Sequence, residues 1–336
     1  MTLLSYQKIS LIILTVLVSA GVSAKVFSER SEVKTFMNQM VTKHGFKKKT
    51  LVTLFKQFES SDEIIQKISR PYEEATWQQY RKLFITKTRI QNGVNFWKKH
   101  ATVLNKAEKT FGVPSEIIVA ILGVETFYGE NVGKYPVLQA LATLAFDYPK
   151  RSAFFLSELE QYLLLTREQN LPADQIKGSY AGAMGTPQFI ASSYRNFAVD
   201  FAKIGKVDLI NNIPNAIGSV ANYFNVHGWQ PDQPVIHKAW IKGQKYKSLQ
   251  LADKQNPKPT LSLATVRKYN VSPINGKNLT PSTQVALIQL QVGPKQEYWL
   301  ARDNFYVITR YNHSVNYAMA VYELSQLIVK EFKRNH

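Results

Sequence analysis

The chain has no cysteine, and this single absence excludes several kinds of chemistry. Without a thiol there is no disulfide framework, no thiolate nucleophile and no cysteine-ligated metal site. Attachment of a lipid through an N-terminal cysteine is excluded for the same reason, so no lipid anchor is expected.

Two common catalytic signatures are also missing. The six histidines show no H-E-x-x-H spacing, which argues against zinc-protease chemistry, and there is no G-x-S-x-G nucleophile elbow. Acidic residues are scarce, with 24 Asp and Glu against 42 Lys and Arg, which gives a net charge of +18. Such an excess predicts an anionic partner, and nucleic acid, anionic lipid and an acidic cell-wall polymer all stay open.

The length and the apolar content predict a folded protein with a substantial core. The chain has 336 residues, of which 45% are hydrophobic, enough for one large domain or two to three smaller ones. Residues 1–24 are typical of a signal peptide, with Lys8 as the one charge, an apolar run over residues 9–18, and Val22-Ser23-Ala24 before a cleavage point. We therefore expect export to the periplasm, with membrane association as the alternative if the segment stays uncleaved.

Residues 25–110 are predicted to be helical, with polar spacers. Trp77, Tyr80 and Phe84 recur at helical intervals, and we assign this stripe to packing rather than to a ligand site.

The most informative stretch is P-S-E-I-I-V-A-I-L-G-V-E-T-F-Y-G, residues 114–129. Pro114 suits a first helical turn, residues 117–124 are apolar on all sides as in a buried helix, and Gly129 is a natural stop. Glu125 then falls in the last turn, where burial and the negative end of the helix dipole both disfavour the carboxylate. A carboxyl that stays protonated near neutral pH can act as a general acid, although a solvated surface residue or an ion-pair partner is the alternative.

The segment G-S-Y-A-G-A-M-G-T-P-Q-F, residues 178–189, predicts an ordered loop. Its glycines and proline argue against a regular helix, while Tyr180, Met184 and Phe189 are too apolar for a flexible linker. Ser179 and Gln188 are the polar groups that it could direct at a ligand. A tight structural turn explains the same pattern equally well.

Residues 200–211 partly match the pattern of a calcium-binding loop. Gly205 falls at the sixth place, as in an EF-hand, but Ala202 and Ile204 stand where positions 3 and 5 need oxygen ligands. We predict no metal here and no cofactor elsewhere. Further helices are expected from Pro149 to before Leu171, with Phe154 and Phe155 on the inner face, and from Asn212 to Gly228.

The composition changes after Trp229. Residues 288–292 alternate as a half-buried strand does, and weaker strand patterns cover residues 235–246 and 261–271. We expect a small β insertion over residues 231–304, followed by a helix over residues 317–332. The predicted fold class is mainly α with a small β insertion.

Several motifs in order resemble the membrane-bound lytic murein transglycosylase B family. They are G-V-E-T-F-Y-G, A-L-A-T-L-A-F-D-Y-P-x-R, G-S-Y-A-G-A-M-G-T-P-Q-F, A-I-G-S-V-A-N-Y-F and R-Y-N-H-S-x-x-Y-A-M-A. The resemblance implies a lysozyme-like helical core. It implies a division into a signal peptide (1–24), an N-terminal helical region (25–110), a lysozyme-like catalytic core (111–230), the β insertion (231–304) and a C-terminal helical segment completing the core (305–336).

The resemblance also implies a reaction. The family cleaves the β-1,4 bond between N-acetylmuramic acid and N-acetylglucosamine in peptidoglycan without water, and leaves a 1,6-anhydromuramoyl end. Its catalytic acid matches Glu125. Its substrate contacts match Ser179, Gln188, Tyr223, Tyr311 and Asn312, while Met184, Phe189 and Tyr317 shape or back the groove.

Two family features are absent, and three other functions stay open. The chain lacks the lipoprotein cysteine and the oxygen ligands of the calcium loop. A muramidase would need a second carboxylate, for which Glu130 and Asp147 are candidates, although Asp147 is expected to cap the helix near Pro149. A non-catalytic wall-binding scaffold is a further alternative, and nucleic-acid binding has no reader motif to support it. The expected partner is the glycan strand; association with other cell-wall enzymes stays open.

Overall fold

The computed structural model describes residues 26–69, 76–276 and 279–334. The signal peptide predicted for residues 1–24 lies outside these ranges. Within the described ranges, no helix combines the length and the apolar character that a membrane crossing needs.

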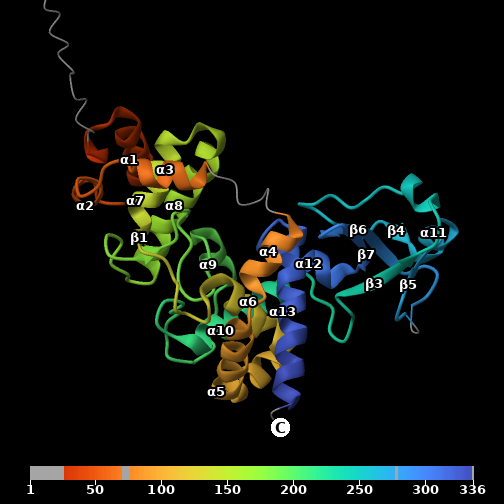
Figure 1. Cartoon of the computed structure of the whole chain (residues 1–336). Helices are drawn as coiled ribbons and strands as arrows, with labels where there is room; N and C mark the ends of the chain where they lie inside the picture. The colour runs from red at the N-terminus through yellow and green to blue at the C-terminus, as the bar shows by residue number, and fades with distance from the viewer. Residues whose placement is uncertain (1–25, 70–75, 277–278, 335–336) are drawn as a thin grey trace, which may run out of the picture.

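The first helices form a layer at one end of the molecule, beside α7 (Val137–Asp147) and α8 (Ser152–Glu168) (Figure 1). They are η1 (Phe27–Glu29), α1 (Ser31–His44), α2 (Lys48–Phe55) and α3 (Asp62–Ile68). Helix α1 buries the apolar stripe Val33, Phe36, Met37 and Met40, as its helical spacing predicts. Arg30 ties this layer to α7 by two hydrogen bonds to Asp147, of 2.9 and 2.7 Å.

Two helices lead from this layer into the core. Helix α4 (Trp77–Phe84) begins with a capping box between Thr76 and Gln79. Helix α5 (Lys87–Phe111) is followed by its C-cap Gly112, whose φ is 72°. Of the stripe assigned to packing, Trp77 is buried, and Tyr80 and Phe84 pack against the main core.

The core is built around α6 (Ser115–Thr126), which is apolar on all sides except at its two ends. Helices α5, α10 (Ile213–Val226) and α13 (Val315–Arg334) pack around it. Figure 1 shows α13, at the end of the chain, running alongside α5 and α6. The short helices α9 (Ala191–Phe197) and α12 (Asp303–Tyr311) complete the helical part. Helix α9 was not predicted from the sequence, whereas most of α12 falls in the C-terminal helical segment expected from residue 305.

Predicted helix boundaries hold with small corrections. Pro149 opens a 3₁₀ turn, η3 (Pro149–Arg151), and α8 follows it and ends before Leu171 as expected. Phe154 was placed on the inner face but is 38% exposed, because Phe155 takes the inward position. Helix α10 begins after its N-cap Asn212, at the predicted start, and it ends at Val226, two residues before Gly228.

A five-stranded antiparallel sheet lies beside the helical core, in the order β4-β6-β7-β3-β5 (Figure 1). Its strands are β3 (Ile236–Ile241), β4 (Leu261–Ser262), β5 (Val271–Pro273), β6 (Gln284–Val292) and β7 (Lys295–Ala301). One face carries Ala286, Ile288 and Trp299 toward the main core, and the other builds a small second core with α11 (Leu263–Lys268).

The strand predicted over residues 261–271 is wrong for the central residues, which form the helix α11. Ser262 accepts a hydrogen bond from the backbone N–H of Thr265 and so caps α11, and helical spacing buries Leu263 and Val266. The strand predicted around residues 288–292 is confirmed as part of β6, and the weaker pattern over residues 235–246 contains β3. A second, two-stranded pair joins β1 (Tyr135–Pro136) to β2 (Lys177–Gly178).

Candidate active site

Glu125 lies in the last turn of α6, as predicted, but the helix does not end at Gly129. It ends at Thr126, because Phe127 takes the left-handed conformation with a φ of 54°. The N–H groups of Phe127 and Tyr128 donate to the carbonyls of Gly123 and Leu122, which closes the last turn. Tyr128 and Gly129 continue with φ values of 67° and 99°.

Contacts with α5 stabilise this costly run of positive φ angles. The Tyr128 hydroxyl donates a 2.7 Å hydrogen bond to the carbonyl of Arg89, and the Arg89 guanidinium lies 5.0 Å from the centre of the Phe127 ring. Room for the Tyr128 ring depends on Gly123, where an added Cβ would come within 2.6 Å of the tyrosine oxygen. The turn that follows Glu125 is therefore held by packing rather than by a glycine cap.

The Glu125 carboxyl is partly buried and has one hydrogen-bond partner from a distant helix. The hydroxyl of Tyr317, in α13, donates a hydrogen bond of 2.5 Å to its Oε1 atom. Burial raises the pKa of Glu125 to about 7, while the bond from Tyr317 works in the opposite direction. Among the described residues no second carboxylate contributes to this pKa, so Glu125 can hold a proton near neutral pH by desolvation alone.

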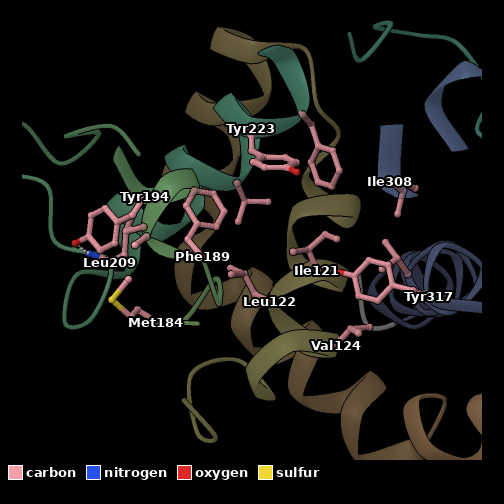
Figure 2. Packing of buried hydrophobic residues seen from close by; sticks show 14 of the residues in the cluster. Ile121, Leu122, Val124, Met184, Phe189, Tyr194, Leu209, Tyr223, Ile308 and Tyr317 are labelled. Carbon is pink, nitrogen blue, oxygen red and sulfur yellow. Dashed lines mark hydrogen bonds between the residues drawn. The ribbon is translucent and has the colours of Figure 1, made fainter. Parts of the chain in front are cut away.

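An aromatic cluster extends from Tyr317 away from the carboxyl group. The rings of Tyr317 and Tyr311 lie nearly parallel, with centroids 6.4 Å apart, and Tyr311 contacts Tyr223 at 4.9 Å and Phe189 at 5.8 Å. Burial raises the pKa of Tyr311, and the charge of Glu125 raises it further. Figure 2 shows Tyr317 reaching toward the side of α6 that carries Ile121 and Val124, with Phe189 and Tyr223 together beyond it.

The hydroxyls of the two inner tyrosines bind backbone carbonyls. Tyr223 donates to Arg310 at 2.6 Å, and Tyr311 donates to Pro187 at 2.5 Å. These bonds join α10, α12 and the glycine-rich loop at one place. Sequence reasoning placed both tyrosines in the substrate groove but did not foresee these structural bonds.

The loop over residues 178–189 is ordered, as predicted, and is fastened to α6 beside Glu125. The Thr126 hydroxyl donates a 2.8 Å hydrogen bond to the carbonyl of Thr186, and Met184 and Phe189 exchange backbone hydrogen bonds. Gly185 is required, because a Cβ there would lie 2.1 Å from the carbonyl oxygen of Leu209. The loop is therefore a rigid wall next to the end of α6.

The side chains of the two polar residues predicted to face a ligand are hydrogen-bonded to nearby backbone groups. Ser179 Oγ accepts hydrogen bonds from the N–H groups of Ala181 and Ala183, and the Gln188 amide donates to the carbonyls of Val132 and Gly185. Gln188 itself has a φ of 53°. Asn312 lies at the exposed corner between α12 and α13, five residues before Tyr317.

Neither candidate for a second carboxylate contributes to the raised pKa of Glu125. Asp147 was expected to cap the helix near Pro149, and this is wrong: its two oxygens accept from Arg30, and neither η3 nor α8 has a side-chain cap. The guanidinium competes successfully because the pair is bidentate. Glu130 is exposed in the turn beyond α6.

The residues of the 200–211 loop do not fit a calcium ion. The Asp200 carboxylate accepts from the N–H groups of Ile204 and Gly205, so both of its oxygens are engaged in the loop itself. From inside, Asn215 accepts from the N–H of Ala202 and donates to the carbonyl of Lys206. Hydrogen bonds thus close a loop that a cation would otherwise organise. Within the described ranges no group of three His, Asp or Glu side chains forms a metal site.

The family match and the named relatives show that this protein is a lytic transglycosylase. Residues 28–326 match the model of the transglycosylase SLT domain, and the chain belongs to that family. The predicted fold class, mainly α with a small β insertion and a lysozyme-like helical core, is confirmed by the solved structures that resemble it.

The relatives are similar over nearly the whole chain. Membrane-bound lytic murein transglycosylase B of Escherichia coli is 40% identical over 318 residues, which cover 90% of this chain and 84% of the relative. The catenated lytic transglycosylase SltB1 of Pseudomonas aeruginosa is 43% identical with a TM-score of 0.86, covering 91% and 99% of the two chains. E. coli Slt35, solved with calcium, is 40% identical with a TM-score of 0.84, covering 92% and 96%.

A more distant relative was solved with a substrate fragment. P. aeruginosa SltB3 in complex with NAG-NAM-pentapeptide is 28% identical, with a TM-score of 0.76, and the match covers 90% of this chain and 79% of that one.

The sequence also missed the hydrogen bond between Tyr317 and Glu125. Tyr317 was expected to shape the groove, whereas its hydroxyl binds the catalytic candidate. The signal available in the sequence was a tyrosine near the start of a helix that follows the β insertion, and nothing in its spacing linked it to Glu125.

Proposed function

We propose that this enzyme cleaves the β-1,4 bond between N-acetylmuramic acid and N-acetylglucosamine in peptidoglycan and forms 1,6-anhydromuramoyl ends. One observation carries the proposal: a partly buried Glu125 whose pKa of about 7 needs no second carboxylate. Two-carboxylate glycosidases divide acid and nucleophile or base between two groups. A single carboxyl suffices when the nucleophile belongs to the substrate.

The chemistry balances without water. Glu125 donates its proton to the glycosidic oxygen as the bond from that oxygen to C1 of the muramoyl residue breaks. The C6 hydroxyl of the same residue then forms a bond to C1 and gives its proton to the Glu125 carboxylate. The acid is thereby restored, and the attack gains the advantage of an intramolecular reaction.

The other site residues position the sugar in this proposal. Tyr317 holds the Glu125 carboxyl in one orientation, and Ser179 and Gln188 bind the glycan from the glycine-rich loop. Asn312 contacts it from the corner before α13, and Tyr223 and Tyr311 brace that wall. The basic surface attracts the acidic polymer, since the net charge is +18.

We also propose the domain division expected from the sequence, with export to the periplasm through residues 1–24. The name of the E. coli relative describes a membrane-bound enzyme, but this chain has no cysteine for a lipid anchor. Strands β3 to β7 fall between residues 236 and 301, in keeping with an insertion at 231–304.

The test is digestion of purified peptidoglycan by the wild type and by Glu125→Gln, with the products read by mass spectrometry. We expect soluble muropeptides one water lighter than hydrolysis products, and loss of roughly 10²-fold or more of the rate in the variant. Reducing ends would identify a hydrolase instead. Binding without release by either protein would favour the wall-binding scaffold.

A further inference from the structure

The part of the chain that builds the sheet carries a strong excess of positive charge. Residues 233–296 contain ten lysines and arginines but a single acid, Asp253. The Asp253 carboxylate accepts hydrogen bonds from the backbone of Gln255 and Asn256, so it serves the loop in which it stands. These cations lie outside the proposed catalytic site, and the chemistry of Glu125 gives no reason for them.

Five of these cations lie at the outer corner of the sheet, where β3 ends and α11 leads into β5. Figure 1 shows α11 and β5 on the side of the sheet away from the helical core. We call these five residues the basic corner: Lys242, Lys245, Lys247, Arg267 and Lys268. All five are exposed, and none forms an ion pair with any residue that the structure describes. Their charge is therefore available to an anionic partner.

The small second core holds the basic corner in place. The N–H of Lys242 donates to the carbonyl of Asn270 at 3.1 Å, which joins the end of β3 to the end of α11. The 3₁₀ turn η4 (Lys245–Ser248) packs inward through Tyr246, whose hydroxyl lies 2.7 Å from that of Tyr298. Helix α11 packs onto the same core. Because the apolar residues of both elements are used inside, their cations are left on the outer surface.

Two large apolar side chains lie exposed beside the basic corner. Trp240 is 55% exposed and Ile274 is 54% exposed. Trp240 stands opposite Ser272, and the N–H of Ile274 donates to the carbonyl of Lys238 at 2.8 Å, so the two apolar residues are diagonal neighbours on one face of the sheet. Trp240 also precedes Lys242 by two residues, which places both on the same side of the strand. The apolar pair therefore adjoins the basic corner.

We propose that this surface docks on an anionic lipid bilayer. Clusters of about four to eight lysines and arginines bind anionic lipid headgroups. Tryptophan rings locate at the boundary between headgroups and acyl chains, and an aliphatic neighbour such as Ile274 adds apolar area that leaves water. A sugar polymer would instead need free hydrogen-bonding groups around the ring of Trp240. The acid on the neighbouring stretch of β7, Glu297, is already paired with Lys238 at 3.2 Å.

Flotation with lipid vesicles tests the proposal on the full chain. Partition is measured into vesicles of phosphatidylcholine alone and into vesicles in which a third of the lipid is phosphatidylglycerol. The apolar run over residues 9–18 would act on both kinds of vesicle alike, so the ratio of the two partition constants reports the attraction to charge. We expect a ratio well above one that falls toward one at about 1 M salt, where the screening length is about 3 Å. A ratio of one at low salt would overturn the inference without any variant.

A pair of triple variants tests whether the basic corner is responsible. The combination of Lys242→Gln, Lys245→Gln and Lys247→Gln should lower the ratio roughly tenfold or more, because each lysine close to an anionic bilayer strengthens binding by roughly fivefold. The matched control changes the three exposed lysines of residues 47–49 to glutamine. They lie at the start of α2, at the opposite end of the molecule, and the ratio should stay unchanged (Figure 1). Circular dichroism checks that each variant is folded.

Single substitutions test the apolar pair. Trp240→Thr should lower partition into the anionic vesicles roughly tenfold and Ile274→Thr about threefold, because less apolar area is buried in the bilayer. Ile204→Thr is the matched control, since Ile204 is 50% exposed in the loop over residues 200–211. Its partition should equal that of the wild type.

Three results would overturn the inference. An unchanged ratio in the corner variant is the first, and an equal fall in both triple variants, which would assign the attraction to the whole surface charge, is the second. The third comes from sedimentation with purified peptidoglycan, in which each triple variant also carries Glu125→Gln so that the wall is not digested. If the corner variant lost wall binding and kept its lipid ratio, the corner would bind the wall polymer. The vesicle assay contains no peptidoglycan, so its outcome is independent of the proposed function.

Discussion

The hydroxyl of Tyr317 donates a 2.5 Å hydrogen bond to Oε1 of Glu125, which stands 192 positions earlier in the chain. The bond joins the ends of two helices, the last turn of α6 and the first turn of α13. It favours the charged carboxylate, whereas burial favours the neutral acid, and burial is the larger effect. The proton of Glu125 is thus governed by two opposed influences that can be changed separately.

Tyr317→Phe removes the influence that favours the carboxylate. The pKa of Glu125 should then rise above about 7, because only desolvation remains. A general acid is lost as the pH rises through its pKa, so the high-pH limb of the rate profile should move to higher pH. The maximal rate should fall about tenfold, because the carboxyl loses its fixed orientation. A pH–rate profile on peptidoglycan measures both effects.

Tyr322→Phe is the matched control for this change. Tyr322 lies on the same helix, and its ring packs 6.4 Å from that of Trp299 rather than on Glu125. The pH–rate profile of Tyr322→Phe should match that of the wild type. If the high-pH limb of the Tyr317→Phe profile stays in place or moves to lower pH, the hydrogen bond from Tyr317 does not lower the pKa of Glu125.

Glu125→Gln should make the protein more stable at neutral pH. The pKa of Glu125 is raised from 4.5 to about 7 in the folded state, so folding favours the protonated form. The contribution of Glu125 to stability is then fully present below about pH 4.5, and it is lost as the pH rises through about 7. Glutamine does not titrate, so the variant should gain up to about 3 kcal/mol relative to the wild type above pH 7.

Urea unfolding at pH 4.5 and at pH 8 tests this prediction. The difference in unfolding free energy between Glu125→Gln and the wild type should be small at the lower pH and large at the higher. A difference that is the same at both values would mean that Glu125 titrates normally in the folded protein.

Asp147→Asn should weaken the fold without changing the reaction. The substitution breaks a bidentate pair with Arg30, whose side chain is 17% exposed, and a loss of about 1–2 kcal/mol is expected. Products should remain anhydro-ended. A double-mutant cycle with Arg30→Gln should show that the two changes are not additive. Loss of activity at full stability would instead make Asp147 the second carboxylate of a muramidase.

Calcium should not stabilise this protein. The loop over residues 200–211 is closed by Asp200 and Asn215, and positions 3 and 5 carry Ala202 and Ile204. Thermal unfolding with millimolar calcium and with a chelator should give the same Tm. A double substitution, Ala202→Asp with Ile204→Asp, should restore oxygen ligands and make Tm rise with calcium. Micromolar binding by the unmodified chain would contradict the prediction.

The sequence predicted those features whose cause is local. Helix α6 was recognised because a buried helix is apolar on every side, and β6 because its side chains alternate. The order of the loop over residues 178–189 was also predictable, since its glycines stand among apolar residues. Gly185 shows the reason, because the close approach of Leu209 leaves no room for a side chain.

The features that were missed depend on distant contacts. Phe127 rather than Gly129 ends α6, because Arg89 on another helix stabilises a conformation that phenylalanine alone disfavours. The carboxylate of Asp147 binds Arg30, 117 positions away, instead of the nearby helix. Tyr317 reaches Glu125 across the whole β insertion. The local spacing of residue types in a sequence does not predict contacts between such distant residues.

The position of α13 in the sequence has a consequence for the synthesis and folding of the chain. During synthesis α6 emerges before strands β3 to β7, and Tyr317, the partner of Glu125, is added only with α13. Contacts between residues so far apart in the sequence form late in folding. The entropy cost of closing a long loop comes before these contacts contribute any stabilising free energy. An incomplete chain would therefore carry the acid but lack the group that orients it. On the proposed mechanism, Glu125 is therefore held in its orientation only after α13 has docked.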